Sequence, residues 1–173
     1  MLEIIRGHLN QPEYLHVFLH PLPIYGLALG AMALLLAIAL KSRPAHIVAL
    51  SLIFVCSLSA WPVAEFGEQA YDVMEAKITA DRDGVAWLDA HAQRATRALP
   101  VFYVLAGVAF LGLLLPWKFP KTSMPLLALT LVCTFVALAA GCWIGYAGGQ
   151  VRHKEFRYGK PSEPLGGYEK MRE

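Results

Sequence analysis

The chain has 173 residues and a net charge of +2, and 57% of its residues are hydrophobic while only 16% are charged. An ordinary soluble domain carries roughly 25% charged residues, so these proportions exclude a typical soluble protein, and the length allows a single domain. The sequence has no Ser/His/Asp arrangement, HExxH motif, phosphate-binding glycine loop or nucleic-acid signature, so it gives little support to a stand-alone enzyme or a nucleic-acid-binding protein.

The N-terminal segment is expected to form a short helix before the first apolar span. The run Asn-Gln-Pro-Glu at 10–13 combines a capping residue, a proline in the first turn and a glutamate at the third helical position, which is typical of a helix start. The run His-Pro-Leu-Pro at 20–23 is expected to end this helix, because proline removes a helical hydrogen bond.

Four apolar segments without Asp, Glu, Lys, Arg or His follow. They comprise residues 22–40, 47–64, 99–115 and 124–146. Each is about as long as the ~17–25 residues with which a helix crosses ~30 Å of hydrocarbon. A helix of a soluble protein would carry polar residues along one face. The sequence therefore predicts an all-α integral membrane four-helix bundle over 1–147, followed by an extramembrane C-terminal tail over 148–173.

The segment between the second and third spans is expected to be helical as well. Apolar residues over 66–74 continue the helical spacing of the second span, and Asp81 or Asp83 is placed to cap the helix that leads into the third. Helices two and three are therefore predicted to extend beyond the bilayer on the outer side as a helical hairpin, with kinks at Pro62 and Pro100.

The distribution of charge predicts how the chain crosses the membrane. The connections at 41–46 and 116–121 together hold four basic residues and no acid, whereas 65–98 holds four basic and seven acidic residues. Short loops rich in Lys and Arg stay in the cytoplasm. We therefore expect a bacterial inner-membrane protein with 65–98 and both termini in the periplasm.

Three histidines lie at the outer ends of three different predicted helices. His20 precedes the first span, His91 lies on the apolar face of the helix that enters the third, and His153 follows the fourth. Four-helix bundles bind cofactors through side chains on facing helices, and imidazole is a common ligand of haem iron and of several other metals. The pattern predicts haem b near the outer face, with two of the three histidines as iron ligands; ordinary interfacial histidines are the alternative.

Other side chains near this outer rim are candidates for supporting roles. Glu68 follows the second span and is a candidate to accept the free N–H of a ligand histidine, although a solvated helix face or a salt bridge explains it equally well. Arg152 is a candidate partner for a haem propionate. His16 lies one helical turn from His20 on the same face, but it does not stand at the end of a span.

Four motifs in order, within roughly residues 17–157, carry a family resemblance. They are His-Pro at 20–21, Gly-Glu-Gln-Ala at 67–70, His-Ala-Gln-Arg-Ala at 91–95 and Gly-Gly-Gln-Val-Arg-His-Lys-Glu-Phe-Arg at 148–157. Together they resemble the small four-helix bacterial membrane proteins related to the DUF2231 family. Members of the wider family look like b-type cytochromes, and some are fused to Rieske iron–sulfur domains. The resemblance therefore implies a four-helix fold and electron transfer. The family often has a second histidine and Phe-Pro after the opening His-Pro, where this chain has Ile-Tyr-Gly at 24–26.

These observations favour a membrane-bound, b-type cytochrome-like electron-transfer subunit. It would hold haem near the periplasmic face and pass electrons between a quinol or membrane partner and a periplasmic carrier. One alternative is a non-redox accessory or assembly subunit that docks a larger membrane complex through the outer hairpin and the Gly/Pro-rich tail at 158–168. Another is a mononuclear copper or zinc site among His20, Glu68, His91 and His153.

Overall fold

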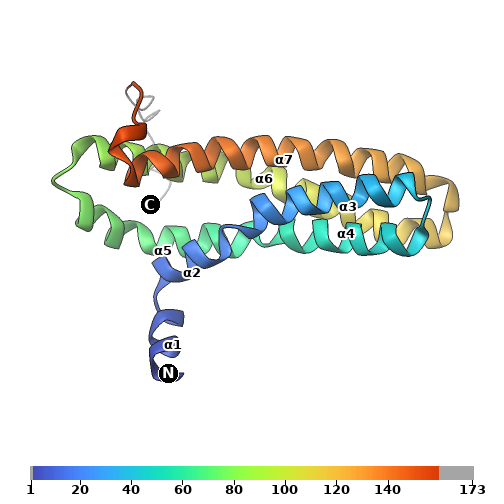
Figure 1. Cartoon of the computed structure of the whole chain (residues 1–173), viewed down its shortest axis with the longest axis horizontal. Coiled ribbons are helices and arrows are strands. Elements are labelled where there is room, and N and C mark those ends of the chain that lie inside the picture. Colours follow the sequence, from blue (N-terminus) through green and yellow to red (C-terminus); the bar gives the residue numbers. More distant parts are fainter. Residues whose placement is uncertain (1, 160–173) are drawn as a thin grey trace.

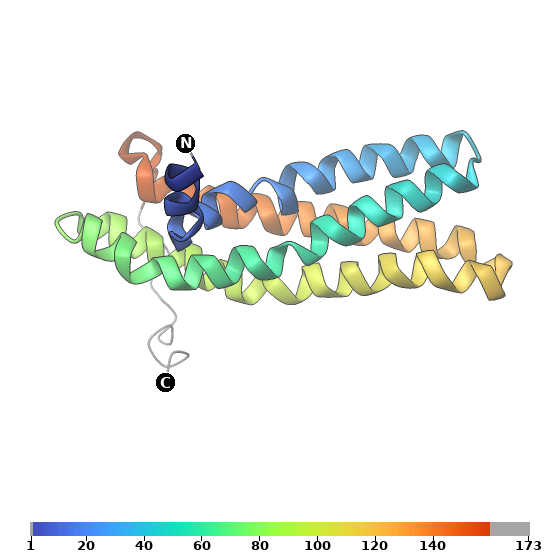
Figure 2. The same cartoon turned by 90° about the horizontal axis from the view of Figure 1, so that it is seen from below.

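The computed structural model describes residues 2–159, and every regular element within that range is a helix. In chain order the elements are α1 (Leu2–Leu9), α2 (Pro12–Leu19), the π-helix η1 (Leu22–Gly26), α3 (Leu27–Ala39), α4 (Arg43–Leu58), α5 (Ala60–Ile78), α6 (Arg82–Lys118), the 3-10 turn η2 (Pro120–Thr122), α7 (Ser123–Arg152) and the 3-10 turn η3 (Lys154–Phe156). Figure 1 and Figure 2 show them as four long columns packed side by side, with α1 projecting from the side. The predicted all-α four-helix bundle is confirmed.

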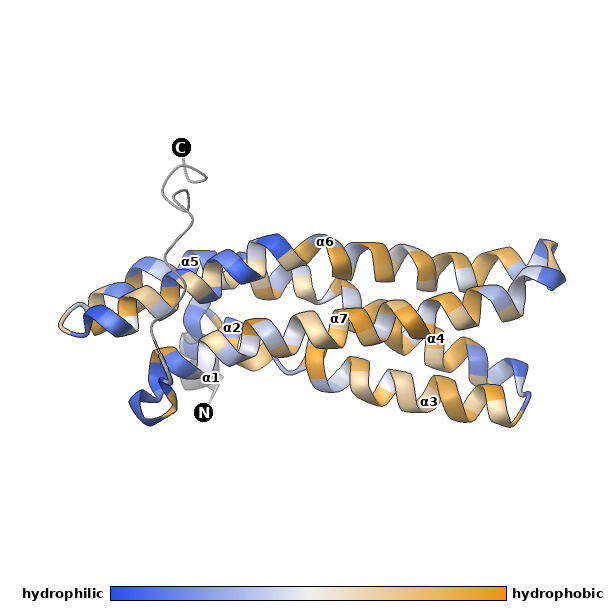
Figure 3. Cartoon of the chain, turned by 90° about the horizontal axis from the view of Figure 1, so that it is seen from above, coloured by the Kyte–Doolittle hydropathy of each residue, from blue (hydrophilic) through white to orange (hydrophobic). Residues whose placement is uncertain are grey.

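The four columns have the length and the surface of membrane-spanning helices. Their helical segments run over Pro12–Ala39, Arg43–Ile78, Arg82–Lys118 and Pro120–Arg152, and each is long and apolar enough to cross a bilayer. Figure 3 shows hydrophobic residues over the middle of the columns and hydrophilic residues at both ends. Large apolar side chains on the outside, such as Met32 and Val48, are 65% and 67% exposed. Lipid is the solvent that suits such a surface.

The interior of the bundle combines large apolar side chains, such as Leu34 and Ile53, with small residues. Ala49, Ala109 and Ala137 are at most 1% exposed, and small side chains let membrane helices approach closely enough for dense packing. The buried hydroxyls of this interior satisfy themselves within their own helices. Ser57 donates to the carbonyl of Ile53 at 2.7 Å, which removes the cost of a lone polar group in an apolar core.

The predicted outer hairpin is present. At about 1.5 Å per residue the 37 residues of α6 measure about 55 Å, well beyond the ~30 Å of hydrocarbon. Asp81 caps this helix by accepting a hydrogen bond from the backbone N–H of Gly84 at 3.2 Å. Of the two caps that the sequence left open, Asp81 is therefore the one used.

The two predicted proline kinks differ in outcome. The second column breaks at Ser59, between α4 and α5. Pro62 explains this position, because it has no N–H for the carbonyl of Leu58 and its ring crowds that carbonyl. By contrast, α6 continues through Pro100 without interruption.

The columns define two distinct ends (Figure 1). The hairpin end contains α1, α2, the α5–α6 connection and η3, and the basic end contains the α3–α4 and α6–α7 connections. This arrangement places 65–98 at the same end as the N-terminal helices. The predicted tail starts at 148, whereas α7 continues to Arg152; residues 160–173 of that tail lie outside the described residues.

Candidate functional site: a histidine pocket at the hairpin end

A pocket lies towards the hairpin end, between α2, η1, the start of α5, the middle of α6 and the C-terminal half of α7. It is lined by three histidines and otherwise by apolar residues: His16, His20, Pro23, Ile24, Ala60, Val63, Ala64, His91, Ala95, Leu99, Phe102, Gly141 and Ile144. We call it the histidine pocket. Its empty volume is about 510 Å³, part of which is open to the surroundings.

His91 is held on α6 by the backbone of α7. Its Nδ1 lies 3.0 Å from the carbonyl oxygen of Ile144. Gly148, one turn further along α7, faces the same ring: a Cβ at this position would lie 3.0 Å from Nδ1 of His91. A Cβ contact of 3.0 Å is tight, and the ring would have to give by a few tenths of an ångström to accept it, so the absence of a side chain at Gly148 leaves room for the imidazole beside the carbonyl.

His16 repeats this geometry on a different pair of helices. Its Nδ1 lies 2.8 Å from the carbonyl oxygen of Val63 on α5. Gly67, one turn further along α5, faces the ring, and a Cβ there would lie 2.9 Å from its Nδ1 and Cε1. In both pairs a histidine packs on a glycine and binds the carbonyl four residues before that glycine.

The hydrogen bonds determine which nitrogen of each ring is available. A carbonyl oxygen only accepts, so Nδ1 of His16 and of His91 must carry the proton. In the neutral imidazole this leaves a lone pair on Nε2, which is the arrangement that metal-binding histidines use. The centroids of the two rings lie 6.1 Å apart with an interplanar angle of 88°. His20 lies one turn along, with its ring centroid 6.3 Å from that of His16.

The chain between α2 and α3 shapes the wall of the pocket beside His20. Here the N–H of Tyr25 donates to the carbonyl of Pro21 at 2.8 Å, and the N–H of Gly26 reaches the same oxygen at 3.4 Å. This wider π-turn places Pro23 and Ile24 in the pocket wall. Single π-turns of this kind often occur at functional sites.

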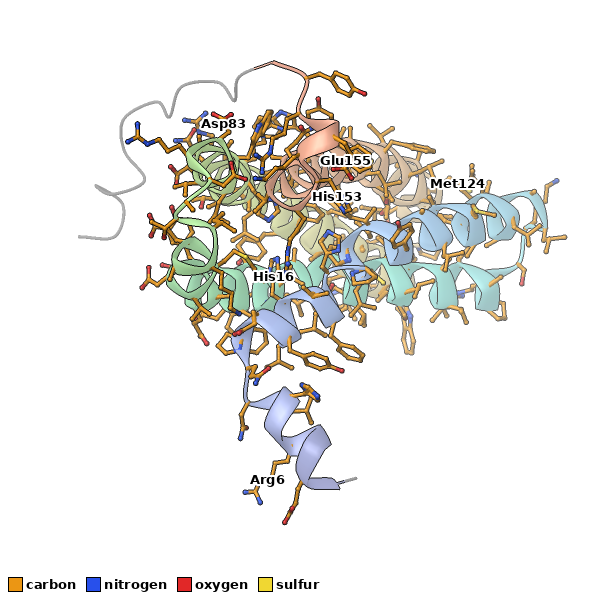
Figure 4. All side chains as sticks on the ribbon, turned by 60° about the vertical axis from the view of Figure 1, so that its left-hand side comes forward. Arg6, His16, Asp83, Met124, His153 and Glu155 are labelled. Atoms are coloured by element: carbon orange, nitrogen blue, oxygen red, sulfur yellow. The ribbon has the colours of Figure 1, made fainter. Side chains whose placement is uncertain are left out.

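The residues predicted from the sequence are not all brought together. His20 and His91 line the pocket, whereas Glu68 and Arg152 are exposed and do not. His153 is exposed, stacks on Phe156 and places its Nδ1 3.1 Å from a carboxylate oxygen of Glu155. Figure 4 shows His153 and Glu155 together at the end of α7 and His16 between the ribbons of the hairpin end.

His16 is the pocket residue that the sequence analysis left aside. The available signal was its spacing of one turn from His20, which places both imidazoles on one face of α2. In the part of the chain that the structure describes, no group of three or more His, Cys, Asp and Glu side chains is placed to hold a metal ion. His16 and His91 are thus the two pocket histidines that share the same arrangement, with the ring packed on a glycine and Nδ1 bound to a backbone carbonyl.

Comparison with known proteins assigns the chain to no family. The chain matches no protein-family model, no curated protein and no solved structure. The functional argument therefore rests on the residues of the pocket.

Proposed function

We propose that the chain is a membrane-bound, b-type cytochrome-like electron-transfer subunit that holds haem b in the histidine pocket. One observation carries the proposal. His16 and His91 approach each other from different helices, and each has its Nδ1 engaged by a backbone carbonyl. Both Nε2 atoms are therefore left with lone pairs. In this proposal His16 takes the place that the sequence analysis gave to His20 or His153.

The spacing and lining of the pocket support a haem. The His16 and His91 rings lie in one pocket with their centroids 6.1 Å apart, so both could contribute a ligand to one bound haem. A porphyrin supplies four ligands itself, so two imidazoles complete the coordination of its iron. Apart from the histidines the lining is apolar, which suits a macrocycle that is mostly hydrocarbon.

The chain's own residues would orient the ligands and exclude water. The carbonyls of Val63 and Ile144 fix the rotation of the two rings and raise the basicity of Nε2. Phe102 and Leu99 cover the apolar side of the pocket. The bound haem iron would supply one-electron chemistry between its ferric and ferrous states. We further propose, from the basic connections at the opposite end, that the hairpin end faces the periplasm of a bacterial inner membrane.

The test is the visible spectrum of protein purified from cells supplied with haem. The decisive variant is His91→Asn, because the asparagine amide can still donate to the carbonyl of Ile144 but has no group at the position of Nε2. We expect a Soret band and a reduced α-band of the b type in the wild type, and loss of both in His91→Asn with its unfolding temperature retained. His153→Asn is the matched control and keeps the bands. A colourless wild-type preparation contradicts the proposal.

A mononuclear copper or zinc site is the second candidate, because His20 lines the same pocket with its ring centroid 6.3 Å from that of His16. Such a site takes three or four protein ligands. His20 would have to move to join His16 and His91 around one ion, since no three such side chains among the described residues are placed to hold one. Metal analysis of the wild type and of His20→Asn separates the two functions. The haem protein keeps its iron and its spectrum in this variant, whereas a three-histidine site loses its copper or zinc. A colourless, metal-free wild type points to an accessory subunit.

A further inference from the structure

A second groove lies at the basic end, lined by residues next to the α3–α4 and α6–α7 connections. Figure 1 shows these connections at the opposite end of the bundle from the α5–α6 connection. The groove is formed where α4, α6 and α7 meet and has an empty volume of about 310 Å³. Its wall includes Arg43, His46, Leu50, Trp117 and Leu127. Polar groups stand at the end of the helices, and leucines line the part nearer the middle of the bundle.

His46 is the residue in this groove that needs a partner. Its backbone N–H donates to the carbonyl of Ser42 at 3.0 Å, so the first turn of α4 is formed. Its ring Nε2, however, is buried and has no hydrogen-bond partner among the described residues. Buried polar atoms are nearly always satisfied in native proteins. A ligand in the groove with a hydrogen-bonding headgroup would satisfy this one.

The charge around the groove favours an anion. Arg43 belongs to the groove wall, and the same end also carries Lys41 before α4 and Lys118 at the end of α6. The sequence has no acidic residue between Glu13 and Glu65 or between Asp89 and Glu155. An anionic group at this end therefore meets several cations and no competing carboxylate.

The position of the groove favours a lipid as the source of that anion. The basic end is where the spans leave the hydrocarbon, and Trp117 is 76% exposed there, as is usual for tryptophan at a membrane surface. Ile47, which is 40% exposed, and Leu113 also belong to the groove wall. Cationic groups beside an apolar, lipid-facing surface suit the headgroup and an acyl chain of a phospholipid.

We propose that this groove binds one anionic phospholipid of the leaflet at the basic end. Arg43 and Nε2–H of His46 donate to the phosphate, and one acyl chain lies on the lipid-facing surface beside Ile47. The site is independent of the histidine pocket and of any cofactor there, because it lies at the opposite end of the bundle.

The test is native mass spectrometry of delipidated protein in detergent, offered equal amounts of phosphatidylglycerol and phosphatidylcholine. We expect one phosphatidylglycerol to remain bound to the wild type, with a preference of about tenfold or more. Arg43→Gln and His46→Phe should each reduce that preference about tenfold. Lys121→Gln is the matched control, because it removes the same charge at the same end but from outside the groove wall.

Each outcome decides the proposal. Equal binding of the two lipids by the wild type overturns it, and so does an equal loss in Lys121→Gln and Arg43→Gln, which would indicate general attraction to the basic end. A parallel measurement adds inorganic phosphate in excess. Displacement of the lipid by free phosphate would show that the phosphate alone accounts for binding and that the acyl chain contributes nothing. That result also contradicts the assignment to a phospholipid.

Discussion

The two histidines of the pocket are held by the same local geometry in two very different parts of the molecule. His91 sits within α6, a helix with many buried residues, among them Trp87, Leu88 and Ala90. His16 sits on α2, an eight-residue helix with no buried residue, on which Val17 and Phe18 are 66% and 63% exposed. The α6–α7 pair is part of the bundle core, whereas α2 is packed on its outside.

The polar contacts of the two regions differ in the same way. A second bond ties α6 to α7 next to His91, because Arg94 donates to the carbonyl of Trp143 at 2.8 Å and also lies over the Trp143 ring. On the other side, α2 is joined to α5 through an exposed pair between Lys77 and Glu13 at 3.3 Å, and exposed ion pairs contribute little. The position of His91 is therefore the more firmly fixed of the two, and that of His16 the more adjustable.

The largest effect on stability is expected when the space beside the His91 ring is filled. In Gly148→Ala the new Cβ would lie 3.0 Å from Nδ1 of His91, within a core that cannot shift. We expect a loss of about 1–3 kcal/mol of stability, seen as a lower unfolding temperature in detergent. Gly149→Ala is the control, because a Cβ there meets nothing within 4 Å and alanine favours the helix. Equal effects of the two substitutions would contradict the role given to Gly148.

A glycine-to-alanine substitution beside the His16 ring should have a smaller effect on stability. In Gly67→Ala the Cβ would lie 2.9 Å from the His16 ring, but α2 can move away as a unit. We expect little change in unfolding temperature, below about 1 kcal/mol, together with faster proteolysis within residues 1–20. Glu68→Ala, at the exposed neighbouring position, should leave both measurements unchanged. A loss of stability as large as that of Gly148→Ala would show that α2 is as firmly held as α6.

The membrane bundle could be predicted from the sequence because the signal is local. Four uncharged segments of spanning length need no knowledge of their neighbours, and the cap at Asp81 follows from its place before an apolar helical run. The break at Ser59 was harder to place, since Pro62 acts on the carbonyl four residues before it.

The histidine pocket could be predicted only in part, because it depends on contacts between distant segments. His20 and His91 were selected by their positions at the ends of spans. His16 lines the pocket because a glycine of the facing helix leaves room for its ring. That glycine, Gly67, lies 51 positions along the chain from His16, so the sequence alone does not link the two. The two histidine–glycine pairs become visible only when the helices are packed. His153 was selected for its place in the sequence; in the structure it contacts Glu155 and Phe156 and is not among the residues that line the pocket.

The smallest effect is expected at the polar contacts of the hairpin connection, outside the membrane. Arg157 places its Nη1 3.0 and 2.9 Å from the two carboxylate oxygens of Asp81, and Lys154 lies 3.2 Å from one of them. The hydrogen bond from Arg157 lowers the pKa of Asp81 below its usual value. A carboxyl with a lowered pKa contributes stability above its unfolded pKa, about 3.9, and loses it as the pH falls through the lower folded value. We therefore expect segment 153–159 to detach only below about pH 4.

At neutral pH the substitution Asp81→Asn should reproduce this detachment. The asparagine can still accept from Gly84 as a helix cap, but it no longer pairs with the two cations. We expect faster tryptic cleavage at Lys154 and Arg157, with the unfolding temperature and the histidine pocket unchanged. Asp83→Asn, two residues along on the exposed side of the same turn, is the matched control. Cleavage accelerated equally by both substitutions would mean that overall charge, rather than the contact of Asp81 with Arg157, holds the segment in place. A fall in unfolding temperature as large as that of Gly148→Ala would mean that the contacts at the surface of the hairpin contribute as much as the packed α6–α7 pair.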